Sequence, residues 1–517
     1  METIVKEPTT TPRAGKRDAA RKQIRGSSLL LTGKLLSLGM NFVSQVLIVR
    51  YLATADYGTW AYALSVVSFC QSFATLGLDR AVTRFVPIYH EKDEYGKLFG
   101  TILLVIGSIL LTGFAAIIFF YSAPEQLSHL LTGNQQPLIL LFILIFLVPV
   151  EAIDSLFVGL FASFSSPGAI FFRKHVLGPG LKVGVVLLLV LWKADVVFLA
   201  YGYLAASVIG ALICLVVLIR LWRQQGLWRR WQLKSLVLPI KEIFAFTIPL
   251  MTSDLLTVLM NSVSVFLLGY FHDTSEVAFF RVVLPAADMN KTVMMSFALL
   301  YTPLAARLFA KADYAGINEL YWRTAIWMAV LSFPIFAVTF AMAQPLTVFL
   351  YGARYEQSGA IMALLSLGYY FSAALGFNGL TLKVLGKLRY IVVINLLAAV
   401  TCLVLNLLLI PRYGAFGAAV AMSATMIAHN IFKQAGLRLV AGISLFDRKY
   451  FSFYLIIAAS AFALLGLQYL TAISIHVALA LAGLVSLFVL AVSKKNLCVA
   501  ETFPELLKLP LLRKILA

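Results

Sequence analysis

Long apolar runs separated by short polar segments dominate the sequence. Each run reaches the roughly 20 residues that a helix needs to cross the hydrocarbon core of a bilayer. Strand-like alternation of apolar and polar residues is absent. We therefore expect an all-α polytopic membrane protein with about fourteen transmembrane helices. The expected segments are 28–52, 59–79, 98–121, 137–161, 171–192, 195–220, 242–271, 277–306, 323–349, 358–382, 388–410, 415–440, 450–470 and 472–493.

Residues 35–47 and 255–267 have nearly the same sequence, with seven of the thirteen positions identical. Polar residues recur in step with apolar ones, which hydrophobicity alone would not enforce, so the pattern indicates two copies of one unit around a shared cavity. This pattern is typical of transporters. We predict two pseudo-symmetric six-helix lobes, with two further helices appended. Their bounds are 28–220 for the N-lobe, 221–241 for a basic linker, 242–440 for the C-lobe and 450–493 for the last pair.

Basic residues predict the orientation, because Lys and Arg stay on the cytoplasmic side during insertion. With the N-terminus inside, the outer segments hold only Lys193, Arg354 and Arg412 of the 42 basic residues. Both termini are therefore expected in the cytoplasm, 1–27 as a basic segment. The tail 494–517 is compatible with an amphipathic segment on the inner interface or with a disordered one. The net charge of +19 then lines the cytoplasmic face and needs no nucleic acid partner.

Composition indicates a membrane protein rather than a soluble domain, with 61% hydrophobic and 13% charged residues and a mean hydropathy of +0.91. Gly33-Lys34 and Gly386-Lys387 lack the glycine-rich turn of a phosphate-binding loop. The four Cys and six His show no metal-ligand spacing. The longest expected outer loop, 122–136, offers only Glu125 and His129 as titratable groups. We expect no catalytic residues, no metal and no cofactor.

Polar residues at membrane depth are the candidates for function, since a charge in lipid usually faces a wet cavity or a partner. Lys34, Asn41 and Gln45 share one helix face. The second copy places Asp254 at the position of Lys34 and Asn261 at that of Asn41. We expect these two stripes to line the cavity. For Lys34, extension of the side chain to the inner headgroups is an equal alternative.

Other helices add further intramembrane charges. Lys182 and Arg281 are expected to face the cavity, as is Lys291, which can pair with Asp288 three residues earlier. Glu151 and Asp154 are also three residues apart, and they are compatible with helix ties or with function. A cavity with several cations suits an anionic group such as a phosphate or pyrophosphate. A cationic drug would require the reverse.

Several motifs resemble those of the polysaccharide transporter family, the Wzx-type oligosaccharide flippases of the multidrug/oligosaccharidyl-lipid/polysaccharide exporter superfamily. They are Arg50-Tyr51-Leu52, Asp56-Tyr57-Gly58, Leu76-Gly77-Leu78, Arg84-Phe85 and the run from Leu405 through Pro411-Arg412-Tyr413-Gly414 to Ala419. The resemblance covers residues 28–493.

The resemblance implies an inner-membrane carrier that moves a polyprenyl-pyrophosphate-linked oligosaccharide to the outer leaflet by alternating access. Its partners would be this substrate, membrane lipids and a polysaccharide polymerase or export machinery. Family members use cavity cations on the substrate, a role that extends here to Lys34, Lys182, Arg281 and Lys291 as hypotheses. Arg50 and Asp56 are expected to form an ion pair that staples the outer hairpin. Two alternatives remain: a multidrug cation antiporter of the same superfamily, and a non-transporting scaffold for polysaccharide assembly.

Overall fold

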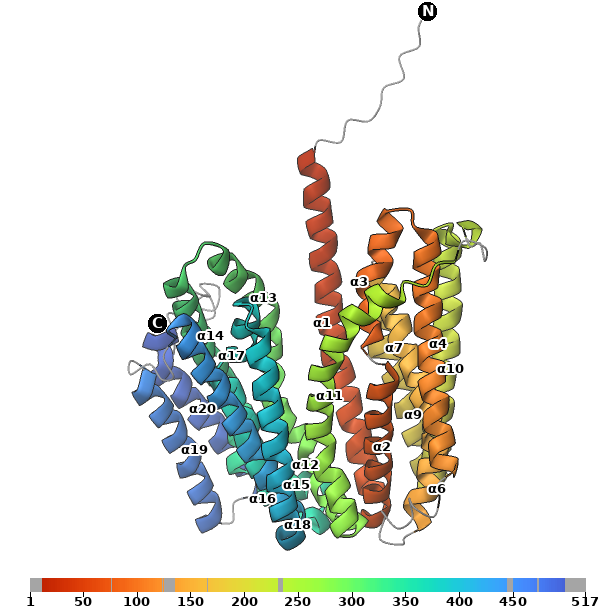
Figure 1. Ribbon diagram of the computed structural model, residues 1–517. Coiled ribbons are helices and arrows are strands. Elements are labelled where there is room, and N and C mark those ends of the chain that lie inside the picture. Colours follow the sequence, from red (N-terminus) through yellow and green to blue (C-terminus); the bar gives the residue numbers. More distant parts are fainter. Residues whose placement is uncertain are drawn as a thin grey trace, which may run out of the picture. The chain divides into compact units, whose positions relative to one another are not determined.

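The computed structural model describes residues 12–75, 77–122, 124, 135–164, 166–230, 236–443, 450–471 and 474–497. Every regular element in these ranges is a helix (Figure 1), which confirms the all-α prediction for this part of the chain. Eleven of the described helices are long and apolar enough to cross a membrane, or up to twelve if one bent pair counts as a span. The protein is therefore a multi-pass membrane protein. Residues 1–11 of the predicted basic segment 1–27 and residues 498–517 of the predicted tail 494–517 lie outside the described residues.

Contacts divide the chain into two compact units. Unit 1 comprises residues 1–48, 70–123 and 139–252, and unit 2 comprises 49–69, 124–138 and 253–517. The predicted lobe boundaries at 28–220 and 242–440 stay a prediction.

Helix α7 is the centre of unit 1, where it contacts α3, α4 and α10. Two segments differ from expectation. Helix α1 begins sixteen residues before the predicted start at 28, and the predicted loop at 80–97 contains the amphipathic helix α3, which follows Gly77 in the left-handed conformation (φ 66°). The elements up to the linker are α1 (Pro12–Tyr51), α2 (Thr54–Thr75), α3 (Leu78–Glu91), α4 (Tyr95–Ser122), α6 (Gln135–Leu144), α7 (Leu147–Ser163), α8 (Pro167–Phe171), η1 (Phe172–Leu177), α9 (Gly178–Leu191), α10 (Val196–Gln224) and η2 (Leu227–Arg230).

Helix α16 has the central place in unit 2, in contact with α12, α14, α15 and α18. The elements from the linker onward are α11 (Ile240–Phe271), α12 (Thr274–Asp288), η4 (Met289–Lys291), α13 (Thr292–Ala310), α14 (Tyr314–Phe336), η5 (Ala337–Ala341), α15 (Ala343–Tyr351), η6 (Ala353–Tyr355), α16 (Ser358–Ala374), α17 (Asn378–Val384), α18 (Leu388–Ala441), α19 (Phe451–Thr471) and α20 (Ile475–Leu497).

The helix expected at 277–306 is broken in the structure. A 3₁₀ turn at Met289–Lys291 separates α12 from α13. A 49° bend follows within α13, between the parts Thr274–Ala298 and Leu300–Ala310 of this candidate span. Pro285 removes a backbone donor just before the turn. Asn290 in the turn is fully buried, and its amide donates to the Ala287 carbonyl at 2.9 Å and to Thr339 Oγ1 at 3.0 Å. Proline and these side-chain bonds account for the 3₁₀ turn between α12 and α13.

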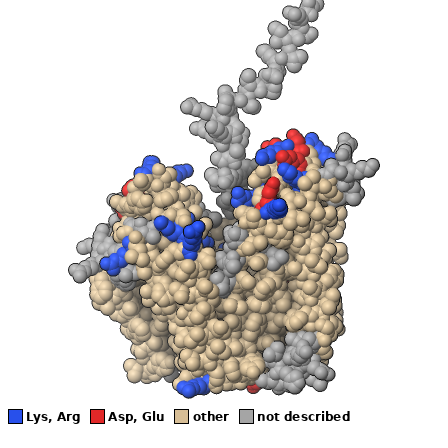
Figure 2. Space-filling view, viewed as in Figure 1, with Lys and Arg blue, Asp and Glu red and all other residues tan. Residues whose placement is uncertain are grey.

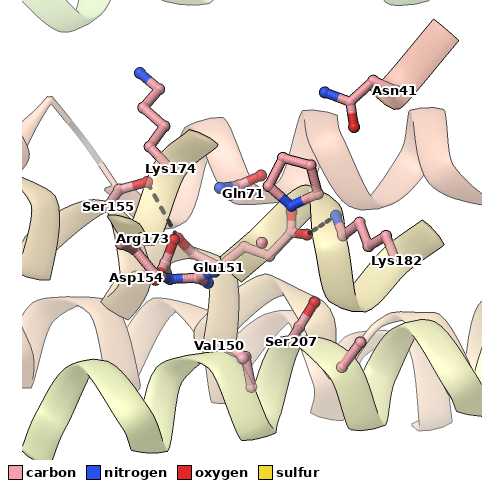
Figure 3. Close-up of a pocket in the computed structure, with 13 residues that line it drawn as sticks. Asn41, Gln71, Val150, Glu151, Asp154, Ser155, Arg173, Lys174, Lys182 and Ser207 are labelled. Atoms are coloured by element: carbon pink, nitrogen blue, oxygen red, sulfur yellow. Dashed lines mark hydrogen bonds and ion pairs between the residues drawn. The ribbon is translucent and has the colours of Figure 1, made fainter. Parts of the chain in front are cut away.

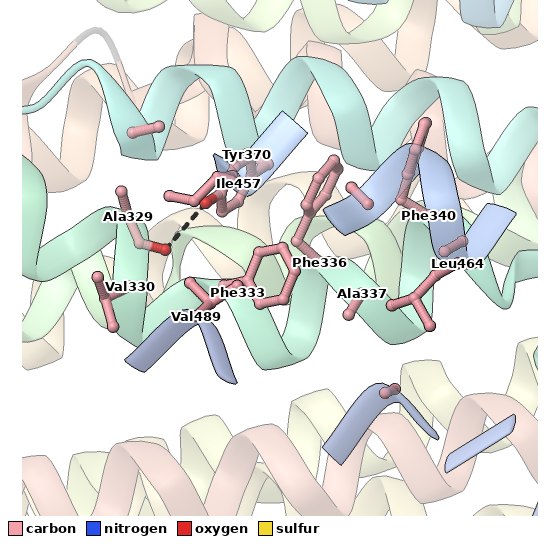
Figure 4. Close-up of a cluster of buried hydrophobic side chains, with 14 of the residues drawn as sticks. Ala329, Val330, Phe333, Phe336, Ala337, Phe340, Tyr370, Ile457, Leu464 and Val489 are labelled. Carbon is pink, nitrogen blue, oxygen red and sulfur yellow. Dashed lines mark hydrogen bonds between the residues drawn. The ribbon is translucent and has the colours of Figure 1, made fainter. Parts of the chain in front are cut away.

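The last two helices pack against α14 and η5 through a buried apolar cluster (Figure 4). Phe336 stacks on Tyr370 with ring centroids 4.0 Å apart, and the Tyr370 hydroxyl donates to the Ala329 carbonyl at 2.9 Å. Small residues such as Ala478 and Ala482 let α20 approach closely. In lipid, such close packing and hydrogen bonding replace the hydrophobic effect as the force that holds helices together.

Charged side chains are unevenly distributed over the surface. On the face shown in Figure 2, most described Lys, Arg, Asp and Glu residues lie toward one end of each unit, and the flanks show other residues. Many large apolar side chains are exposed, among them Leu111, Ile118 and Leu212. A surface of this kind is suited to contact with acyl chains.

Candidate functional site

Unit 1 contains a polar cavity of about 250 Å³ that is lined by residues of candidate membrane spans. Five of its helical elements and one π-helical turn contribute lining residues, and charged groups of both signs point into it (Figure 3). The polar lining residues are Asn41, Gln71, Glu151, Asp154, Ser155, Arg173, Lys174, Lys182 and Ser207.

Helix α7 supplies the two carboxylates. Glu151 and Asp154 are three residues apart and therefore lie on one face of the helix. Asp154 accepts a hydrogen bond from Arg173 Nε, and Glu151 Oε1 accepts one from Lys182 Nζ at 3.2 Å. Each carboxylate thus neutralises one cation from the η1–α9 segment.

Arg173 is the most buried charge of the site, with 9% of its side chain exposed. It lies in η1, a π-helical turn between α8 and α9. Such turns insert one residue into the helical repeat and occur often at functional sites. Glycines make room for the guanidinium: a Cβ at Gly210 would lie 3.1 Å from Nη1, and one at Gly178 would lie 2.9 Å from it. The local sequence therefore provides a fitted recess for Arg173.

The two lysines of the site are more accessible than Arg173. Lys182 has 32% of its side chain exposed, and its Nζ lies 5.3 Å from the centroid of the Tyr203 ring. Lys174 is exposed and points away from both carboxylates (Figure 3). The cavity thus combines three cations with two carboxylates, an excess of one positive charge. An anion that enters would meet Lys174 and would compete with the carboxylates for Arg173 and Lys182.

The family model described as "Polysaccharide biosynthesis protein" matches residues 24–303, more than half of the chain. The chain belongs to this polysaccharide biosynthesis family. A second model, MatE, matches residues 249–408. These matches confirm the family expected from the motifs.

Curated relatives of this polysaccharide biosynthesis protein are distant. The capsular polysaccharide biosynthesis protein CapF of Staphylococcus aureus is 21% identical over 407 residues, which cover 77% of this chain and 95% of CapF. The uncharacterized membrane protein MJ1068 of Methanocaldococcus jannaschii is 20% identical over 415 residues, which cover 77% of this chain and 80% of that protein.

Solved structures share the fold of this family member. The inward closed conformation of the lipid II flippase MurJ matches with a TM-score of 0.69 at 14% identity, over 92% of this chain and all of MurJ. An inward-facing multidrug resistance MATE family transporter of the MOP superfamily matches with a TM-score of 0.62 at 14% identity, over 79% of this chain and 95% of that one. The protein therefore has the fold of these membrane transporters.

The predicted stripe residues have different positions in the structure. Asn41 and Lys182 line the unit 1 cavity, whereas Gln45 is not among its lining residues. Lys34 is partly buried and lies near enough to Lys174 for their charges to repel each other. The side chains of Asp254 and Asn261 lie outside the described residues. The cavity role of these side chains stays a prediction.

The other predicted cations gather around Tyr369 in unit 2. Lys291 forms the expected ion pair with Asp288, and its Nζ lies 4.4 Å from the Tyr369 ring centroid. Arg281 donates to Ser65 Oγ at 2.8 Å and interacts electrostatically with Tyr369. The self-neutralising pair is thus confirmed. Substrate contact by these residues stays a prediction.

The expected Arg50–Asp56 staple differs from what the structure shows. No ion pair between the two occurs in the described part of the chain. Arg50 instead donates through Nε to the Leu350 carbonyl at 2.8 Å and through Nη2 to the Phe349 carbonyl. In return, Arg354 donates to the Val49 carbonyl and, at 3.0 Å, to that of Arg50. Carbonyls at a helix C-terminus lack intrahelical donors, which explains why they attract both arginines.

Sequence reasoning missed Arg173 and Lys174 because it counted them with the cytoplasmic basic residues, at the start of the segment expected at 171–192. The structure places both in an uninterrupted candidate span, Pro167–Leu191. A signal was available in the sequence, since apolar residues flank these two charges on both sides. Gln71 and Ser207 were also missed, because small polar residues in apolar helices carry little signal by themselves.

Proposed function

We propose that the protein is a flippase, not an enzyme, that moves a polyprenyl-pyrophosphate-linked oligosaccharide across the cytoplasmic membrane by alternating access. Its product would feed the synthesis of a surface or secreted polysaccharide. The observation that carries the proposal is the cavity with Arg173, Lys174 and Lys182 in a transporter fold of a polysaccharide biosynthesis family.

In the proposed mechanism the pyrophosphate exchanges with the carboxylates of α7. Lys174 provides the first attraction, and phosphate oxygens then replace Asp154 on the Arg173 guanidinium, whose planar fork matches phosphate geometry. Lys182 then releases Glu151 and binds the phosphate oxygens in its place. The prenyl chain stays in the lipid.

Exchange of this kind also offers a means of energy coupling. Entry of the anion releases Glu151 and Asp154 from their cations, and return of the carboxylates to Arg173 and Lys182 expels the anion. Directed transport requires that binding be favoured in the inward-open state and release in the outward-open state. An ion or proton gradient, or consumption of the product outside, would supply this bias.

The proposed topology has fourteen spans with both termini in the cytoplasm. Helix α18 counts as two spans in this scheme, since the 52 residues of Leu388–Leu439 would form a helix about 78 Å long. That length is more than twice the roughly 30 Å of the hydrocarbon core. The non-helical Gly414 supplies the outer turn.

Purified protein in liposomes with a fluorescent polyprenyl-pyrophosphate disaccharide would test the proposal. Chemical quenching from outside reports the fraction of substrate that has crossed. We expect Arg173→Gln and Lys182→Gln each to slow translocation at least tenfold. The matched control Arg223→Gln removes an exposed arginine at the end of α10, outside the cavity, and should leave the rate unchanged. Translocation at the wild-type rate in both cavity variants would refute the role of these cations.

A cation antiporter is the second candidate, and the two carboxylates of the cavity favour it. In the same liposomes a cationic dye would then be transported in exchange for protons. Glu151→Gln or Asp254→Asn would stop this dye transport. Dye transport without movement of the lipid-linked sugar would replace our proposal with this one. A scaffold would move neither compound.

A further inference from the structure

Unit 2 contains a second cavity, of about 230 Å³, at one end of α15, α16 and α19. It shares no residue with the unit 1 cavity. Its polar lining residues are Gln344, Glu356, Gln357 and Gln468, and Phe340 and Tyr469 add aromatic rings. In the proposed topology this end of unit 2 faces the outer side of the membrane.

Gln468 brings an unused hydrogen-bond acceptor to this cavity. Its Oε1 is buried and has no hydrogen-bond partner among the described residues. Buried polar atoms are nearly always paired, so we expect the Gln468 amide to turn toward a donor from a ligand or from water in the cavity. On another part of the lining, Gln344 Nε2 donates to Glu356 Oε1 at 2.7 Å, which leaves the Gln344 carbonyl and the remaining Glu356 lone pairs as further acceptors.

The chemistry of the lining indicates the class of ligand. No Lys, Arg or His is among the residues that line this cavity, and one carboxylate is, so an anionic phosphate is disfavoured. Three amides and a carboxylate instead offer donors and acceptors side by side. Hydroxyl groups, which both donate and accept, match such a set.

Aromatic rings add an apolar surface to the same cavity. Phe340 is held in place by Phe336, with ring centroids 4.8 Å apart, and by Phe462, at 5.7 Å (Figure 4 shows Phe336 and Phe340). Tyr469 is 73% exposed at the mouth. A sugar ring combines a rim of hydroxyls with a face of C–H groups, and it can satisfy the amides and cover an aromatic ring together.

The shape of the cavity is defined by small residues. A Cβ at Gly359 would lie 2.8 Å from Gln344 Cα, so α15 and α16 are in close contact there and Gln344 has a fixed position. Ala341, Ala360 and Ala363 leave the space beside them open.

We propose that this cavity is a binding site for a neutral sugar ring, with Gln468 Oε1 as an acceptor for one of its hydroxyls. The site is separate from the cationic cavity, and its occupancy does not depend on the proposed flippase activity. The sugar would come from a glycan at the outer surface or from the headgroup of a neutral glycolipid, which present the same chemistry.

Saturation-transfer NMR with the full-length protein in a sugar-free detergent tests the site directly. The probes are methyl glycosides of glucose, galactose, mannose, rhamnose and N-acetylglucosamine. We expect saturable binding of at least one probe. Gln468→Leu should weaken it at least tenfold, and Ala363→Phe, which fills the cavity, should abolish it. The matched control Gln225→Leu, at the exposed end of α10 in unit 1, should leave it unchanged.

Thermal unfolding of each variant shows whether it is folded, and only variants with the wild-type midpoint count. A nanodisc arm with a monoglycosyl diacylglycerol identifies the source: binding of the free glycosides supports a glycan, and binding of the glycolipid alone supports a headgroup. No saturable binding of any probe, or wild-type affinity in Ala363→Phe, would overturn the proposal. Arg173→Gln should retain sugar binding, so failure of the flippase proposal and failure of this one are distinguishable.

Discussion

At the scale of single residues, the site is defined by which carboxylate pairs with which cation. Asp154 pairs with Arg173 and Glu151 with Lys182, across 19 and 31 residues of sequence. Both pairs are partly buried, so their charges are costly to leave alone but contribute little net stability when intact. This balance suits a binding site, because a ligand can replace one partner at a small net cost.

The effects of substituting Asp154 and Arg173 on stability should be strongly coupled. Arg173→Met leaves a carboxylate in a mostly buried site, and we expect a loss of roughly 3 kcal/mol of stability. Asp154→Leu leaves the guanidinium alone and should cost a similar amount. The double variant removes both charges and should be more stable than either single variant. Thermal unfolding in detergent measures all three, and simple additivity of the two losses would contradict a direct interaction.

At the scale of elements, the motif around Gly414 is explained by a break in α18. Gly414 has φ 51° and ψ −133°, a conformation that only glycine adopts without strain. Glu276 of α12 accepts a hydrogen bond from the Ala415 backbone N–H at 2.5 Å, and His272 Nε2 lies 2.7 Å from the Ile410 carbonyl. The turn between α11 and α12 thus satisfies both new helix ends, as a cap does.

Substitutions at this break should destabilise the protein to different extents, most for Gly414→Ala, less for Glu276→Ala and least for Glu276→Gln. Gly414→Ala meets backbone strain of about 1–3 kcal/mol, and its Cβ would overlap the Glu276 carboxylate. Glu276→Ala removes only the cap and should lower the stability by about 1 kcal/mol. Glu276→Gln should lower it by less. Gly386→Ala is the control, because Gly386 also has a positive φ (72°) but a Cβ added there would have no other atom within 4 Å. A midpoint of thermal unfolding for Gly414→Ala equal to that for Gly386→Ala would contradict the overlap.

Another motif glycine has a packing role. A Cβ at Gly58 would overlap the backbone carbonyl of Thr274, so the start of α2 lies directly against the start of α12. The motif residues Arg50 and Gly58 therefore belong to one set of contacts at one end of unit 2, made largely with backbone atoms. Contacts of this kind depend on residue size and donor geometry, so a larger residue at position 58 or a shorter one at position 50 would not make them.

At the scale of the whole molecule, the topology predicts which loops are accessible from outside. In a cysteine-free background, a cysteine at position 413 should react with a membrane-impermeant maleimide on intact cells. Cysteines at 225, 311 and 386 should react only after permeabilisation, because their connections lie on the cytoplasmic side. Mass shift of the labelled protein is the readout. Labelling of 311 or 386 in intact cells would show that a span has been missed or added.

Sequence alone determined that the chain spans the bilayer, that it is helical and which family it belongs to. Hydrophobicity and helix length are local quantities, and family motifs such as the one at Gly414 contain their own signal. The Lys291–Asp288 pair was also predictable, since both partners lie on one helical turn.

Only the tertiary structure decided how distant residues combine. The sequence placed Arg173 among the cytoplasmic basic residues, whereas the π-helical turn and the bond with Asp154 place it inside a cavity. The sequence predicted that Arg50 pairs with nearby Asp56, but Arg50 donates to the carbonyls of Phe349 and Leu350 instead. Such pairings depend on the three-dimensional packing of helices far apart in the chain, because a charge at membrane depth takes whichever complementary group the fold brings within reach.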